Sequence, residues 1–438
     1  MKMKAISLLA ALSATAIVLP VCTHAPQAQA QAASEVPGAL RVVGHVYMQT
    51  NGVKNEIVHY GRQANGCLIE LGRIATGGKG SGTYKPVYNK PNEPNAFEGV
   101  NSVLITPDHR YLFTTNGGEN SVSSFKIGDG GRLTLMDVEA TGQQVRGKSG
   151  TAKTLAYAPR TGTLYVGHAF GPDHIRLFSV KKGKLKRKSG SYSVNTPTKL
   201  DRVMTQIVLT PDSRFLMATL LFDHEPKINH PGDPNGMDVA VSNAKDKDGL
   251  VIFPVKENGD LGKPQIIDAG GPAAFATEFL HGSNDTFVTS YAGGNGLTMG
   301  HISPSGEVTH SPLVTIDITK GMPSEMCWLA ITPDNKQVLT TVFGFSSVSS
   351  YKIADGELQI AQDPAAPAVP GDGTFKALDG LVSSGPNDSL ISPDGKFFYQ
   401  IYPNVSKLIS YQLSSEGVLT KIDEDAIPYT SPQGLAGF

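Results

Sequence analysis

A short apolar run, the tripeptide Thr-Pro-Asp and a second apolar run recur along this chain. The first copy, Thr106-Pro107-Asp108, lies between Leu104-Ile105 and Tyr111-Leu112-Phe113. Later copies are Thr210-Pro211-Asp212, Thr332-Pro333-Asp334, Ser392-Pro393-Asp394 and the degenerate Ala158-Pro159-Arg160. Proline presets φ and the aspartate caps the backbone, so the tripeptide predicts a tight turn between two strands. Recurrence at roughly 50 residues predicts an array of stacked units.

Each unit contains four segments with the pattern of short strands. In the first complete unit, residues 111–116 follow the turn, residues 121–127 alternate with period two, and residues 132–138 follow a Gly-rich turn. Four short strands joined by tight turns and repeated at this period are typical of a propeller blade. The sequence therefore predicts an all-β, seven-bladed β-propeller with four antiparallel strands per blade, formed by residues 34–438 as a single domain.

The repeat also sets the order of the blades and the way the ring closes. Blades 1 to 7 are expected at about 41–76, 100–142, 152–197, 203–271, 272–319, 325–362 and 385–427. Blade 1 has segments for its second, third and fourth strands (42–49, 56–62 and 68–75) but none for its first. The apolar tail, residues 431–438, has no blade of its own. We predict that the tail supplies the innermost strand of blade 1, which leaves no open sheet edge.

The first 33 residues have the pattern of a signal peptide. Lys2 and Lys4 precede an apolar run at 6–21, and Ala28-Gln29-Ala30 is a small-x-small cleavage site. Removal of residues 1–33 and a periplasmic or secreted protein are expected. Cys22 raises the alternative of a lipoprotein, although the bulky Val21 precedes it. No later run of 18 apolar residues exists, so no membrane span is predicted.

Charge and cysteine content exclude several classes of protein. The chain has 38 Lys+Arg against 39 Asp+Glu, which offers no basic excess for nucleic acid. Cys67 and Cys327 follow the leader and fall in non-adjacent blades, so no disulfide between them is expected. No nucleophile elbow, P-loop, dinucleotide fingerprint or established metal-ligand spacing occurs. We therefore expect no cofactor, no metal and, because a closed ring needs no partner, a monomer. Calcium binding by the oxygen-rich insert 222–248 is the alternative.

The lengths of the connections distinguish the two faces of the ring. Turns after the first and third strands of a blade emerge on one face, and these include the short Thr-Pro-Asp turns. The long segments 76–100, 222–248 and 363–386 all fall on the opposite face. Long connections in a compact fold are often functional. We expect the site at the channel mouth on this long-loop face, and a structural role for the Thr-Pro-Asp turns.

Candidate site residues follow from counting back along the inner strands from each turn. Five positions before the turn lie Asn101, Lys153, Thr205, Cys327 and Asn387, and beside them Gln206, Trp328 and Asp388. We predict that substrate is bound by Asn101, Lys153, Gln206, Cys327, Trp328 and Asn387, in a small-molecule site at the channel mouth.

Catalytic candidates are polar residues on inner strands or at strand ends that open on the long-loop face. His168 is the expected acid–base group, Arg202 with Lys153 would hold a carboxylate or oxyanion, and Glu278 or Glu325 would orient the reacting groups. The alternative for each residue is a hydrogen-bonded core group or a solvated loop group.

The units resemble those of the seven-bladed propeller lactonase family, from about residue 41 to 438. The resemblance is carried by Ile-Thr-Pro-Asp (105–108), Tyr-Leu-Phe-Thr-Thr-Asn (111–116) and Asn-Ser-Val-Ser-Ser-Phe-Lys-Ile (120–127). The family includes propeller-type 6-phosphogluconolactonases and carboxymuconate-cyclising enzymes, and segments 325–334 and 348–353 look most like exported bacterial members.

The resemblance implies an exported enzyme that opens or closes a ring on a small lactone or muconate-type carboxylated substrate. The phosphogluconolactonase-like members share a Pro-His pair five positions before the turn, and this chain has no histidine there. No catalytic residue is therefore carried over from the family. The alternative is a non-catalytic exported propeller that binds a protein, glycan or small ligand through its long-loop face.

Overall fold

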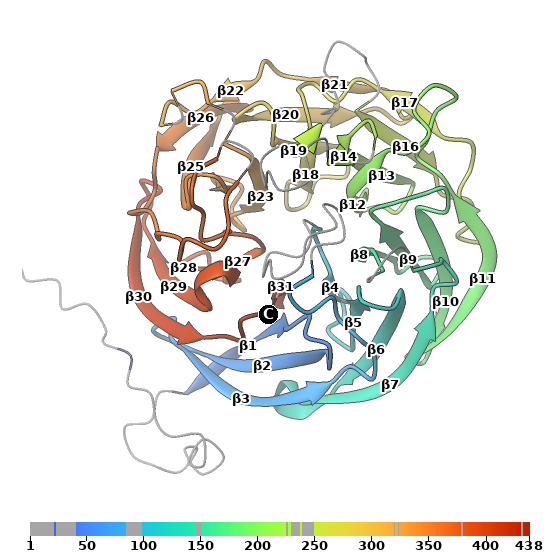
Figure 1. Cartoon of the computed structure of the whole chain (residues 1–438), viewed down its shortest axis with the longest axis horizontal. Helices are drawn as coiled ribbons and strands as arrows, with labels where there is room; N and C mark the ends of the chain where they lie inside the picture. The colour runs from blue at the N-terminus through green and yellow to red at the C-terminus, as the bar shows by residue number, and fades with distance from the viewer. Residues whose placement is uncertain are drawn as a thin grey trace, which may run out of the picture.

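The fold is a ring of seven antiparallel sheets, each with four strands on its main path (Figure 1). The computed structural model describes residues 22, 41–84, 99–145, 150–224, 227–228, 237–238, 249–318, 320–322, 324–377, 380–430 and 432–438. The predicted all-β, seven-bladed propeller is confirmed. None of the helices within these ranges is long and apolar enough to cross a membrane.

The strands follow the repeat in every blade. Blade 1 contains β1 (Val42–Gln49), β2 (Glu56–Gln63) and β3 (Leu68–Ala75). Blade 2 contains β4 (Val103–Ile105), β5 (Tyr111–Asn116), β6 (Ser121–Ile127) and β7 (Leu133–Ala140). Blade 3 contains β8 (Ala152–Ala158), β9 (Thr163–His168), β10 (Ile175–Lys181) and β11 (Lys184–Tyr192). Blade 4 contains β12 (Val203–Leu209), β13 (Phe215–Phe222), β16 (Leu250–Pro254) and β17 (Gln265–Ile267).

The other three blades repeat this order. Blade 5 contains β18 (Ala274–Phe279), β19 (Thr286–Tyr291), β20 (Gly296–Ile302) and β21 (Val308–His310), and β22 (Val314–Thr315) also pairs with β20. Blade 6 contains β23 (Met326–Ile331), β24 (Gln337–Val342), β25 (Ser347–Ala354) and β26 (Glu357–Gln362). Blade 7 contains β27 (Ser389–Ile391), β28 (Phe397–Tyr402), β29 (Lys407–Leu413) and β30 (Leu419–Ala426). Within the insert of blade 4, β14 (Lys227–Ile228) pairs with β15 (Met237–Asp238); most of that insert lies outside the described residues.

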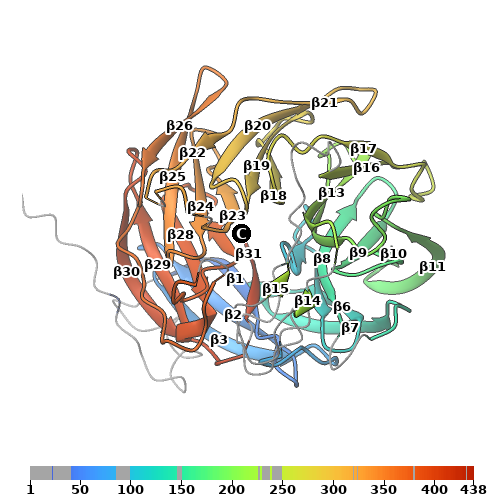
Figure 2. The same cartoon turned by 45° about the horizontal axis from the view of Figure 1, so that its top comes forward.

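The C-terminal segment closes the ring as predicted. Strand β31 (Gln433–Gly437) pairs antiparallel with β1, with Leu435 opposite Met48, and the sheet order is β3-β2-β1-β31. His45 and Phe438 exchange backbone hydrogen bonds of 2.8 and 3.0 Å. Figures 1 and 2 place the C-terminus close to the centre of the ring. Blade 1 is therefore built from segments at opposite ends of the described chain.

One side-chain hydroxyl group stabilises each copy of the recurring turn. The Thr106 hydroxyl donates to the Asp108 carboxylate (2.6 Å) and accepts the backbone N–H of Tyr111 (3.0 Å). The copies that begin at residues 210, 332 and 392 make the same pair of contacts. The residue after the aspartate is left-handed, with φ between 52° at His109 and 70° at Gly395, which favours glycine and asparagine there. Each copy thus fixes the hairpin between the first two strands of its blade.

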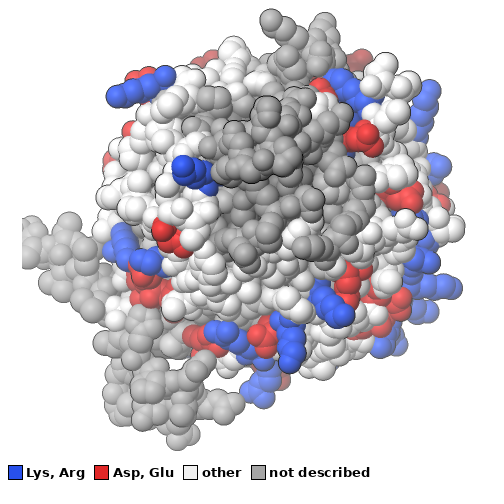
Figure 3. All heavy atoms as spheres, in the orientation of Figure 1, with Lys and Arg blue, Asp and Glu red and all other residues white. Residues whose placement is uncertain are grey.

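The core consists of side chains packed between neighbouring sheets. Phe113 and Val122 of blade 2, for example, pack with Leu155, Leu164 and Phe178 of blade 3. Charged side chains of both signs are interspersed around the rim of the face in Figure 3. The inner edges of the sheets surround the channel that holds the candidate site.

Candidate active site in the central channel

A cavity of about 630 Å³ occupies the central channel on the side of the Thr-Pro-Asp turns. Its walls come from the innermost strands β4, β12, β18, β23, β27 and β31. Pro333 and Pro393 of the turns and the nearby His281, all exposed, line its outer end, so the cavity opens to solvent on the turn face. Its volume lies within the range of small-molecule sites.

The lining changes from polar to apolar toward the opening. Four or five positions before the turns lie Asn101, Gln206, Thr277 and Asp388, which we call the polar layer. Directly before the turns lie Ile105, Leu209, Ile331 and Ile391, which we call the apolar layer. Consecutive strand residues advance roughly 3.3 Å, so the three or four positions between the two layers correspond to about 10–13 Å.

Glu278, on β18, lies between the two layers. Its carboxyl group accepts the backbone N–H of Ile331, and burial raises its pKa to about 8. The His281 ring contacts the same residue through the next peptide group, because Nε2 lies 3.2 Å from the Ile331 carbonyl oxygen. The Glu278 carboxyl is therefore protonated at neutral pH and can donate a hydrogen bond into the cavity.

Asp388 directly precedes β27 and is the second acidic residue of the cavity. Its Oδ2 accepts the backbone N–H of Gly434 at 2.6 Å, and the backbone N–H of Asn101 also donates to this carboxyl group. Burial raises the pKa of Asp388 to about 7, against the opposite effect of these two hydrogen bonds. Asn101 has φ 62°, a left-handed conformation two residues before the inner strand of blade 2. At neutral pH the Asp388 carboxyl is partly ionised.

Two carboxyl groups with different proton affinities in one cavity can serve as a general base and a general acid. Among the described residues, no lysine or arginine lines the cavity. The site can therefore move protons, but it offers no fixed positive charge to an anionic ligand.

Three of the ten predicted site residues line this cavity: Asn101, Gln206 and Glu278. Gln206 is fixed in place, because its Oε1 accepts the backbone N–H of Thr277 at 2.6 Å. The repeat alignment places Asp388 beside the channel but assigns it no role. Its raised pKa depends on burial by blades 1, 2 and 7 together, which the pattern within one blade does not show.

His168, at the end of β9, lies outside the cavity and is fully buried. Nδ1 lies 3.1 Å from the His174 carbonyl oxygen and Nε2 lies 2.9 Å from the Thr141 hydroxyl. Nδ1 therefore carries the proton, and Nε2 accepts from the hydroxyl. Burial lowers the pKa of His168 to about 3. Both ring nitrogens already have partners, so the predicted acid–base residue is a neutral core group in this structure.

Arg202 joins the same buried region between blades 3 and 4. Its backbone carbonyl accepts from His174 Nε2 (3.0 Å), and its guanidinium contacts the Val194 carbonyl and, at 3.5 Å, the Asp223 carboxylate. The side chain has no exposed surface. His174 therefore links Arg202 to His168. These residues belong to the buried core between blades 3 and 4 and lie outside the lining of the channel cavity.

The remaining predicted residues also lie outside the cavity lining. Lys153 is fully buried and contacts the Ser81 hydroxyl at 3.1 Å. Asn387 is buried and donates to the Pro432 carbonyl at 2.8 Å, while Cys327 is a buried residue of β23. Glu325 precedes β23, and its carbonyl accepts the N–H of Phe343 at 3.1 Å.

Trp328 closes the channel toward the long-loop side. Its ring packs edge-on against Phe275, with 4.7 Å between ring centroids, and Nε1 donates to the Gly99 carbonyl at 3.1 Å. Val100 belongs to the same apolar cluster. The expected site lay at the long-loop mouth, yet the cavity opens on the other face, because these side chains fill the channel between them. Residues 85–98 and most of 225–248, which belong to the expected mouth, lie outside the described residues.

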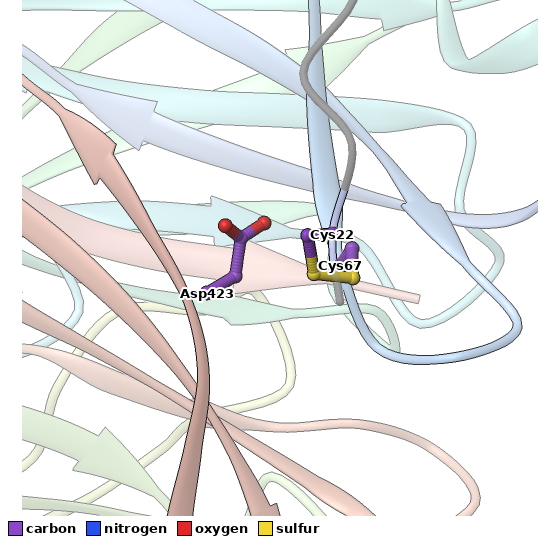
Figure 4. A group of neighbouring side chains, drawn as sticks. All are labelled: Cys22, Cys67 and Asp423. Atoms are coloured by element: carbon purple, nitrogen blue, oxygen red, sulfur yellow. A yellow bond between two sulfur atoms is a disulfide. The ribbon is translucent and has the colours of Figure 1, made fainter. Parts of the chain in front are cut away.

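Cys22, Cys67 and Asp423 form a group of metal-ligating residue types among the described residues (Figure 4). Cys22 and Cys67 are joined by a disulfide, with 5.9 Å between their Cα atoms, and Cys327 is not disulfide-bonded. A disulfide offers no thiolate, so the group has no metal-binding sulfur in this state. The expectation that Cys67 and Cys327 do not pair is confirmed. Cleavage at the predicted position would remove Cys22 and leave Cys67 as a thiol.

No family model matches the chain, and neither does any curated protein sequence. Solved structures with the same fold do match. A candidate 6-phosphogluconolactonase from Bacteroides fragilis has a TM-score of 0.63 at 13% identity, over 92% of this chain and 100% of that chain. A periplasmic gluconolactonase from Pseudomonas aeruginosa has a TM-score of 0.60 at 13% identity, over 90% of this chain and 98% of that chain. A protein from Lactobacillus plantarum has a TM-score of 0.62 at 14% identity, over 89% and 98%. At these identities the likeness shows the fold alone.

Proposed function

We propose that this propeller, which has the fold of proteins named as lactonases, is an exported enzyme that hydrolyses a small, uncharged lactone in its channel cavity. One observation carries the proposal: Glu278 and Asp388 line the same cavity, with proton affinities close to neutral pH. The names of the Bacteroides and Pseudomonas neighbours support lactone chemistry, and the name of the latter supports a periplasmic location.

The two carboxyl groups act as general base and general acid in ring opening. Ionised Asp388 takes a proton from a water molecule, whose oxygen forms a bond to the lactone carbonyl carbon. Protonated Glu278 then donates its proton to the ring oxygen as the acyl carbon–oxygen bond breaks. The product is a hydroxy acid, and the proton on Asp388 returns to Glu278 through solvent. The new carboxylic acid then loses its proton to solvent at neutral pH, and repulsion between this anion and the ionised Asp388 favours release of the product.

A muconate-type or phosphorylated substrate fits this cavity less well than an uncharged one. Anions in proteins are normally held by arginine, lysine or backbone N–H groups, and arginine does so bidentately. The two cations expected to do this, Lys153 and Arg202, are fully buried away from the cavity lining. A negative group in the cavity would instead raise the cost of ionising Asp388.

The test is a hydrolysis screen of γ- and δ-lactones, followed by proton release in weak buffer. Glu278→Gln and Asp388→Asn each remove one proton-transfer group with little change in shape. General acid–base groups typically contribute about 10²–10⁴-fold, so each variant is expected to lose at least about 100-fold in kcat. Glu357→Gln and Asp355→Asn are matched controls, because both residues are exposed on the β25–β26 hairpin of blade 6. Full activity in both cavity variants would refute the assignment.

The same preparation tests the alternative of a non-catalytic binding protein. No turnover of any lactone, together with saturable ligand binding that Asp388→Asn weakens, would identify the channel as a binding site only. The intact mass of protein recovered from the periplasm or medium tests export, with loss of about 30 residues expected.

A further inference from the structure

We infer that the channel cavity takes an amphipathic lactone, with its ring in the polar layer and an unbranched aliphatic tail directed through the apolar layer to the turn face. That the ligand is a lactone rests on the proposed function, whereas its amphipathic character follows from the lining of the cavity alone.

The polar end of the ligand is expected in the polar layer because the hydrogen-bonding side chains gather there. Gln206, Thr277 and Asp388 are each at most 6% exposed, and the Glu278 carboxyl lies one position nearer to the opening. Buried polar groups of this kind recognise a polar ligand atom and penalise an apolar one. Both proposed catalytic groups therefore face the polar end of the ligand.

The outer part of the cavity has the opposite character. Besides the apolar layer it is lined by Leu104, Val208, Phe279, Leu390 and Ala436. Between the catalytic carboxyls and the exposed prolines of the turns, the lining side chains that can form hydrogen bonds are few, chiefly Ser389 and His281. A polyhydroxylated ring placed here would bury hydroxyl groups against aliphatic carbon, at a cost in free energy.

The orientation follows from the closed end of the channel. Val100, Phe275 and Trp328 form one buried cluster beyond the polar layer, and Trp328 is 1% exposed. Within the described part of the chain, the cavity leaves room for the remaining part of a ligand with its polar end at the carboxyl groups toward the turn face. About 10–13 Å of channel lies in that direction between the two layers, counted over three or four strand positions.

The test uses saturated γ-lactones whose side chain lengthens from methyl to octyl on the same ring. Burial of each additional methylene should raise kcat/KM about two- to fourfold until the tail reaches solvent. Glucono-δ-lactone, an uncharged lactone with hydroxyl groups in place of a tail, should be hydrolysed at least about 100-fold less efficiently than the best γ-lactone. Leu209→Ser places a hydroxyl in the apolar layer and should flatten the rise with chain length, while Leu135→Ser, at a 38% exposed position on β7, should leave it unchanged.

A second measurement separates this inference from the proposed function. Binding of primary alcohols from butanol to decanol to the unmodified protein, measured by calorimetry, reports the apolar layer without any chemistry. Affinity that rises with chain length while no lactone is turned over would remove the lactonase proposal and keep the amphipathic site. Lactone hydrolysis that is independent of chain length, or fastest with glucono-δ-lactone, would overturn the inference and keep the lactonase proposal. Folding of each variant is checked by its thermal midpoint.

Discussion

Glu278 should contribute a decrease in the free energy of unfolding as pH rises through the neutral range, because the folded protein holds a proton on Glu278 that the unfolded chain has lost. The ordinary pKa of this carboxyl is 4.5, and in the folded protein burial raises the pKa to about 8. Between these two values Glu278 binds more protons in the folded state than in the unfolded state, so its contribution to the free energy of unfolding decreases with pH. The stabilisation is complete below about pH 4.5 and is lost as pH rises through about 8.

The size of the effect follows from the same two values. A tenfold change in proton affinity corresponds to about 1.4 kcal/mol, so the whole interval corresponds to at most about 5 kcal/mol. Glu278 faces a cavity that opens to solvent, which reduces its cost of ionisation. We therefore expect about 1–3 kcal/mol between pH 5 and pH 9.

Urea unfolding of the wild type, Glu278→Gln and the control Glu357→Gln at pH 5, 7 and 9 measures this contribution. The glutamine at 278 cannot ionise, so this variant should lose about 1–3 kcal/mol less than the wild type and the control between pH 5 and pH 9. Parallel curves for all three proteins would show that Glu278 ionises at its ordinary pKa, and the assignment of the general acid would then fail.

Three further predictions follow from other parts of the structure. Burial raises the pKa of Asp388 to about 7, so Asp388→Asn should lose less free energy of unfolding than the wild type between about pH 4 and pH 7. The same urea series measures this difference. His168→Ala should cost about 2–4 kcal/mol by removing a buried hydrogen-bonded ring, yet leave kcat per folded molecule unchanged; a loss of kcat without a loss of stability would restore this histidine to the active site. Leu435→Ala, on the closing strand β31, should lower the free energy of unfolding by about 2–5 kcal/mol. Deletion of 433–438 should abolish cooperative melting. A deletion variant that melts cooperatively would contradict the importance of β31 for closure.

The sequence predicts the fold well because each blade repeats local chemistry. The hydroxyl of Thr106 and its counterparts fixes every Thr-Pro-Asp hairpin, and the unpartnered tail could be assigned to blade 1 by elimination of open edges. These signals lie within a few residues of one another, so a single chain displays them.

The residues that line the cavity could be predicted only in part, because their position relative to it depends on contacts between blades. Polar side chains at equivalent positions differ only in what covers them: Lys153 is buried against Ser81, whereas Asn101 reaches the cavity. Whether the channel is filled on one side depends on Trp328 and Phe275, which belong to different blades. Counting back from the turns therefore found Asn101 and Gln206, but it also selected four residues outside the cavity lining, namely Lys153, Cys327, Trp328 and Asn387.

The pairing of β1 with β31 also determines how the ring must assemble. Val46 and Gly437 are partners about 390 residues apart, whereas blades 2 to 7 each form from one contiguous segment. Pairing over such a separation carries the largest loop-closure entropy in the fold, so it is expected to form late and slowly. A circular permutant that links Phe438 to residue 41 and begins within the turn at 128–131 would make this pairing local. The seam of the ring is thus set by the connectivity of the chain, and the architecture itself would allow it in any blade.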